Sequence, residues 1–64
     1  MKEELMKELL NQGASQIVAN GVVWMLKTPE QEQELMDYLI SVREKMIPAE
    51  RLLLKANQIV HKKD

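Results

Sequence analysis

The side chains of this 64-residue chain that could do chemistry are few. Glu30, Glu34 and Asp37 share one face if residues 29–46 form a helix, and grouped carboxylates can transfer protons or hold a metal ion. The simpler interpretation is a solvated acidic turn, which the positive end of a helix dipole favours. His61 is the only histidine and lies near the C-terminus, where we expect a solvent-exposed side chain. We therefore expect no metal site and no cofactor.

Nucleophiles are equally scarce. The chain has no cysteine, which excludes a thiol nucleophile, a disulfide and a zinc site built from thiolates. Ser15 is interpreted as the first residue of a strand and Ser41 as a helix-surface residue, and no glycine-rich phosphate loop is present. The sequence predicts a protein that is not an enzyme.

Charge is separated along the chain. Residues 30–37 carry four acids and no base, whereas residues 51–63 carry four bases and no acid. Arg51, Lys55 and Lys62 would form a basic stripe on a helix, and such a stripe could contact phosphates weakly. The net charge of −1 provides no general attraction to nucleic acid. We favour a stripe that pairs with the acidic helix; a weak nucleic-acid-binding accessory protein is the alternative.

The length of the chain limits its core. A domain of this size buries only about 60% of the surface that its unfolded chain exposes. Without disulfides or a metal, association with a partner is the remaining source of stability. We expect residues 1–64 to form a single small domain that assembles as a homodimer or larger oligomer.

We expect no targeting signal in this sequence. The first ten residues, MKEELMKELL, mix Lys and Glu and lack the uncharged core of a signal peptide. The uncharged segment of residues 11–26 contains Asn, Gln, Ser and Gly, and it is too short and too polar to span a bilayer. We expect a cytoplasmic protein with no membrane contact.

Three segments have helical periodicity. Residues 2–12 place apolar side chains at helical spacing, and Gly13 follows where a helix commonly ends. Thr28 and Pro29 form a helix start, which predicts a helix over residues 29–46. Pro48 begins a third helix, predicted over residues 48–61.

The apolar segment QIVANGVVWML, residues 16–26, has two interpretations. As a β-hairpin over residues 15–27, it would turn at Asn20-Gly21, a pair typical of type I′ turns. As a helix it would extend the first helix to residues 2–26, at a cost of about 1 kcal/mol for each interior glycine. Because Gly13, Asn20-Gly21 and Thr28-Pro29 all agree with the hairpin, we favour an α+β fold. The alternative is all-α, with one long helix followed by two more.

A hairpin of this composition would be apolar on both faces and would need a covering partner. Trp is enriched at the centres of protein interfaces, and Trp24 is the largest apolar side chain available. The sequence thus predicts a non-enzymatic interaction or regulatory protein that associates with itself and acts on another protein. Its predicted oligomer interface consists of Ile17, Val22, Val23, Trp24, Met25 and Leu26.

Overall fold

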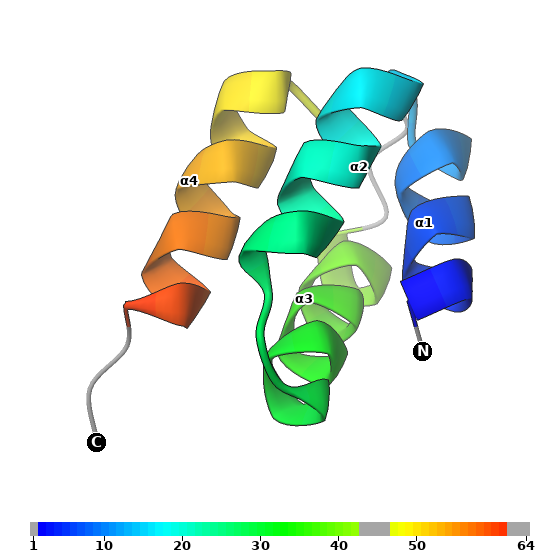
Figure 1. The fold of residues 1–64 in the computed structure, drawn as a ribbon. Coiled ribbons are helices and arrows are strands. Elements are labelled where there is room, and N and C mark those ends of the chain that lie inside the picture. Colours follow the sequence, from blue (N-terminus) through cyan, green and yellow to red (C-terminus); the bar gives the residue numbers. More distant parts are fainter. Residues whose placement is uncertain (1, 43–46, 62–64) are drawn as a thin grey trace.

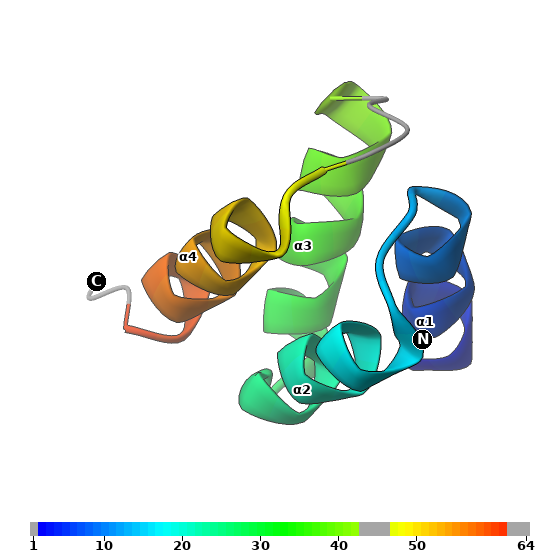
Figure 2. The same cartoon turned by 90° about the horizontal axis from the view of Figure 1, so that it is seen from above.

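The computed structural model describes residues 2–42 and 47–61, and in these ranges the chain forms four α-helices and no strand (Figure 1). α1 packs against α2 and α3, and α4 packs against the same two helices. The two outer helices, α1 and α4, therefore lie on either side of the other pair, as Figure 2 shows from above. The helices are α1 (Lys2–Asn11), α2 (Gln16–Met25), α3 (Pro29–Val42) and α4 (Ala49–Val60).

The core is one cluster of aliphatic side chains to which every helix contributes a stripe at three- and four-residue spacing. This spacing places the side chains on one face of a helix, so each helix buries a single face. Methionines and Tyr38 pack around the edge of the cluster. The buried apolar residues are Leu5, Leu9, Ala19, Val22, Val23, Leu26, Leu35, Leu39, Ile47, Leu52, Ala56 and Ile59.

The predicted α+β fold is wrong, because residues 16–25 form a helix rather than a β-hairpin. A two-stranded ribbon is marginal by itself, and its unpaired edges would need a partner strand, which the described residues do not provide. The helix satisfies its backbone internally and turns Ala19, Val22 and Val23 into the core. Asn20 and Gly21 lie on the opposite, exposed side, where the glycine costs only helix propensity.

The alternative prediction, an all-α fold, is right in its class. Its single long helix over residues 2–26 is wrong, because α1 and α2 are separate helices. Gly13 has a positive φ of 95° and ends α1. Its backbone N–H donates to the carbonyl of Leu10 at 3.1 Å, and that of Ala14 donates to Leu9 at 3.1 Å. This pair of bonds is the Schellman arrangement, which a left-handed glycine makes possible. The predicted stop at Gly13 is confirmed.

Ser15 starts α2 rather than a strand, so its predicted role was wrong. Its Oγ accepts a hydrogen bond from the backbone N–H of Val18 at 3.2 Å, as an N-cap residue does. The chain therefore leaves one helix at Gly13 and enters the next at Ser15, with only Ala14 between them.

The start of α3 follows the prediction closely. The Oγ1 of Thr28 accepts from the backbone N–H of Gln31 at 3.2 Å. In return, Gln31 Oε1 accepts from the backbone N–H of Lys27 at 2.7 Å, one residue earlier than in a standard capping box. The last four residues of the predicted helix 29–46 lie outside the described residues. The last helix starts directly after Pro48 and agrees with the predicted range 48–61 to within one residue at each end.

None of the four helices is both long enough and apolar enough to cross a bilayer, within the residues that the structure describes.

Candidate interaction surface

The most unusual surface feature is the outer side of α2. Ile17 and Trp24 are 84% and 82% exposed, although both are large apolar side chains. They are seven residues apart, or about two turns, and therefore lie on the same side of the helix. Asn20 and Gly21 lie between them and are also exposed. We call these four residues, Ile17, Asn20, Gly21 and Trp24, the α2 face.

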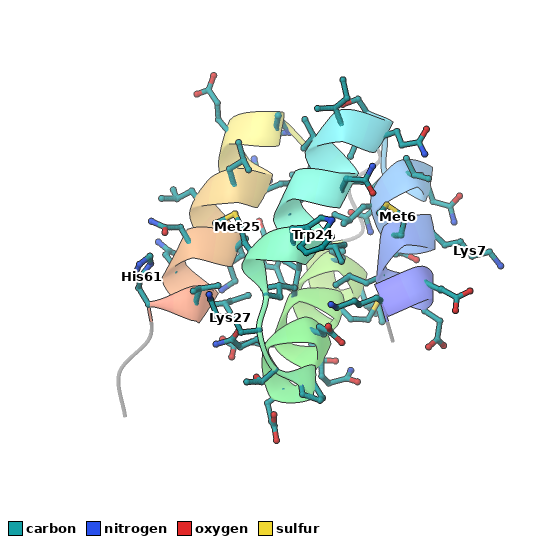
Figure 3. The ribbon with its side chains drawn as sticks, in the orientation of Figure 1. Met6, Lys7, Trp24, Met25, Lys27 and His61 are labelled. Atoms are coloured by element: carbon teal, nitrogen blue, oxygen red, sulfur yellow. The ribbon has the colours of Figure 1, made fainter. Side chains whose placement is uncertain are left out.

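The packing of α2 explains why this side is open. α2 lies between α1 and α4, and its inner side is covered by the core. Figure 2 shows α2 at the edge of the bundle, with α3 on the far side of the core. In Figure 3 the Trp24 ring lies against the outside of α2, whereas Met25 points toward α4. The α2 face is thus a protruding surface rather than a groove.

On one flank the α2 face borders α1. The Nζ of Lys2 lies 6.0 Å from the centroid of the Trp24 ring, at the outer limit of a cation–π contact. Gln12 lies about 80° around α1 from Lys2 in one direction and contacts α3. Leu10, which is 42% exposed, lies about 80° in the other direction, on the side of Lys2 away from α3. This flank extends the apolar surface beyond α2.

On the other flank the face borders α4. The Nζ of Lys55 lies 5.1 Å from the centroid of the Tyr38 ring, which places that side of α4 against α3. Leu53 lies about 160° around the helix from Lys55 and so lies on the side toward α2. It is also 42% exposed.

No charge interrupts the face along the chain. The sequence from Leu9 to Leu26 contains no Asp, Glu, Lys or Arg. A charged macromolecule would find no complementary charge on α2 itself, whereas an uncharged apolar surface would lose little on contact with it.

The middle of the α2 face lacks a large side chain, because Gly21 lies there. A Cβ built on Gly21 would meet no atom within 4 Å, so the packing of the chain itself does not require a glycine there. In a helix interior a glycine costs about 1 kcal/mol relative to alanine. Gly21 therefore lowers the stability of the monomer, and the open space beside it has no packing role within the chain.

The predicted interface residues fall into two groups. Ile17 and Trp24 are on the α2 face, and Met25 is half-buried on the side toward α4 (Figure 3). Val22, Val23 and Leu26 are buried in the core of the chain. Their part in an oligomer interface stays a prediction, and the buried three are accessible to a partner only if the chain opens.

One residue of the predicted basic stripe, Lys55, contacts a side chain of the same chain. Arg51 is exposed, Lys55 is half-buried against Tyr38, and Lys62 lies outside the described residues. Since α3 and α4 pack together, the basic side of α4 lies beside the acidic helix. The nucleic-acid contacts assigned to this stripe stay a prediction.

The candidate carboxylates do not gather into a site. Within residues 2–42 and 47–61, no group of three or more His, Asp or Glu side chains could hold a metal ion. Asp37 Oδ1 accepts from Gln33 Nε2 at 2.9 Å, and His61 Nδ1 lies 3.0 Å from the carbonyl oxygen of Asn57. Each is a local contact within one helix.

An open hollow of about 620 Å³ lies along α1. A single helix, α1, provides its walls, so it is an open surface hollow rather than an enclosed site. Its lining residues are Lys2, Glu3, Glu4, Met6, Lys7 and Leu10.

Two polar side chains, Gln12 and Glu32, are buried although the sequence pattern did not predict it, and Gln12 joins two helices. Its Nε2 donates to Glu8 Oε2 at 2.8 Å and to the carbonyl oxygen of Leu39 at 2.9 Å, joining α1 to α3. Its Oε1 is buried without a hydrogen-bond partner. Spacing could have found it, because Gln12 follows Leu5 and Leu9 at helical intervals.

Comparison with protein-family models found no match to this chain. Comparison with curated proteins and with solved structures also found no similar protein.

Proposed function

We propose that this chain is a non-enzymatic interaction protein that associates with itself through the α2 face. The observation that carries the proposal is the exposure of Ile17 and Trp24, each more than four-fifths accessible to solvent. Isolated exposed apolar residues are common, but two large ones on one face, flanked by Leu10 and Leu53, indicate a binding surface. The cytoplasmic location expected from the sequence belongs to the same proposal.

The chemistry of the face supports a binding role. Trp is the residue type most enriched among the anchors of protein interfaces, and Trp24 is the only one in the chain. Because its backbone is already fixed in a regular helix, a partner that covers Trp24 has only the side chain left to order.

The expected affinity follows from the burial. Covering one large apolar side chain contributes about 1.5–3 kcal/mol, so Ile17 and Trp24 of two copies contribute about 6–12 kcal/mol. Association costs about 4–15 kcal/mol in lost motion. The free energy gained by burial and the cost of association are similar in size, so burial of Leu10 and Leu53 must provide the net free energy of binding. We expect a dimer with a dissociation constant in the micromolar range or weaker.

Sedimentation tests the proposal over a concentration series from about 1 µM to about 1 mM. We expect the average mass to rise from monomer to dimer. Trp24 is also an intrinsic reporter, and its fluorescence should shift to shorter wavelength as the dimer forms. A monomer at every concentration, with unchanged emission, would refute the proposal.

A pair of variants assigns the association to α2. Ile17→Ala removes half of the apolar anchor and keeps the fluorescent reporter; it should raise the dissociation constant at least about tenfold. Leu54→Ala is the matched control, because Leu54 is exposed on α4 at the side away from the core. It should leave the dissociation constant unchanged. An unchanged dissociation constant for Ile17→Ala, with a raised one for Leu54→Ala, would show that the contact does not involve the α2 face.

A further inference from the structure

The α2 face is nearly symmetric about its own midpoint. Ile17 and Trp24 lie three and a half residues before and after the point between Asn20 and Gly21. The two large apolar side chains are therefore at the ends of the face, and the two small residues are at its centre.

The geometry points to a specific partner for this face: the α2 helix of a second copy, running antiparallel and crossing at Asn20-Gly21. This inference rests on the proposed function and adds the arrangement of the two chains. A two-fold axis at the midpoint brings Ile17 of each copy onto Trp24 of the other, so that both apolar ends are covered at once.

Helix packing geometry agrees with this crossing. Ile17 and Gly21 form one ridge at four-residue spacing, and Asn20 and Trp24 form the next. Ridges of this type interdigitate when two helices cross at about −50°, the commonest arrangement in globular proteins. Gly21 leaves open space at the crossing point, where a side chain would hold the two backbones apart. The open space at Gly21, which has no packing role in the monomer, would therefore let the two helices approach closely in the pair.

The chemistry also selects a second copy over other occupants. The face has no charge of its own, so it matches another uncharged face better than nucleic acid. Near the two-fold axis Asn20 lies opposite its own mate, and two amide side chains can donate to and accept from each other. The exposed apolar area per copy is on the order of 500 Å², from Leu10, Ile17, Trp24 and Leu53. Two copies together would bury about 1,000 Å², which is the lower limit of a specific interface.

Engineered cysteines test the arrangement, because the natural chain has none to interfere. Under mild oxidation, Asn20→Cys should form a disulfide-linked dimer, since residues near a two-fold axis face their own mates. Ile17→Cys alone and Trp24→Cys alone should not link, because each lies about 10 Å along the helix from its mate. An equal mixture of these two variants should link. A parallel pair would give the reverse: Ile17→Cys and Trp24→Cys would each link to themselves.

A second measurement does not depend on oxidation. Gly21→Ala places a methyl group at the crossing and should raise the dissociation constant of the dimer at least about fivefold. An unchanged or lower dissociation constant would overturn the crossing at Gly21. Vesicles of phosphatidylcholine provide the competing outcome: if the Trp24 emission responds to vesicles and not to protein concentration, the face binds lipid and the inference fails.

The outcomes separate the two proposals. If sedimentation detects no dimer, the proposed function fails and the pairing fails with it. If a dimer forms but the cysteines link in the parallel pattern, only the antiparallel arrangement is wrong.

Discussion

The two glycines of the chain should respond in opposite ways to replacement by alanine. Gly21 is inside α2, with a helical backbone, and a Cβ there would meet nothing within 4 Å. Gly13 has a φ of 95°, in the left-handed region that alanine enters only with strain. The same chemical change thus tests two different backbone states.

The magnitudes follow from these states. Gly21→Ala should raise the free energy of unfolding by about 1 kcal/mol, the difference in helix propensity between the two residues. Gly13→Ala should lower it by about 1 kcal/mol, since the left-handed conformation costs about 1–2 kcal/mol and the stiffer unfolded chain offsets part of this. In a domain of this size, 1 kcal/mol corresponds to about 4–8 °C in Tm.

Thermal melts followed by far-ultraviolet circular dichroism measure both shifts. The protein concentration should be low, so that dimer formation does not add to the apparent stability. A lower Tm for Gly21→Ala would refute the helical assignment, because only a turn with positive φ at this residue would be damaged. A higher Tm for Gly13→Ala would mean that one helix continues through residue 13.

Three further changes test the core and the helix ends by chemical denaturation. Ser15→Ala removes the N-cap bond to Val18 and should lower the unfolding free energy by about 1 kcal/mol; no change would mean that α2 starts elsewhere. Gln12→Ala should cost about 1–3 kcal/mol, since it leaves a buried carbonyl oxygen of α3 without its donor, and a neutral result would remove its role in joining α1 to α3. Leu39→Ala should cost about 2–5 kcal/mol, whereas Ile40→Ala, next to it but half exposed, should cost much less; equal losses would contradict the orientation of α3.

Local chemistry was enough to predict where α1 ends, where α3 starts and, to within one residue, both ends of α4. Gly13 stops α1 because only glycine adopts a positive φ without strain, and Thr28-Pro29 starts α3 through a side-chain cap and a fixed φ. These signals act over three or four residues, so no information about the rest of the chain was needed. Helical spacing also predicted the centres of the apolar stripes of α1, α3 and α4, but not their margins, since Leu10, Ile40 and Leu53 are exposed.

The candidate site could be predicted only in part. The sequence drew attention to Trp24 and its neighbours but could not separate Ile17 and Trp24, which are exposed, from Val22 and Val23, which are buried. Under the hairpin interpretation, alternate residues share a face; under the helical one, residues three and four apart do. The choice of period therefore determined which side chains were expected to meet a partner.

The sequence by itself determined where α1 ends and where α3 starts, that the chain is rich in helix, and that residues 9–26 carry no charge. Only the tertiary structure decided that Asn20-Gly21 lies within a helix. The physical reason is that a local turn preference is small, whereas placing Ala19, Val22 and Val23 against α1 and α4 buries three side chains at once. The same packing left Ile17 and Trp24 on the outside, which is the basis of the proposed dimer.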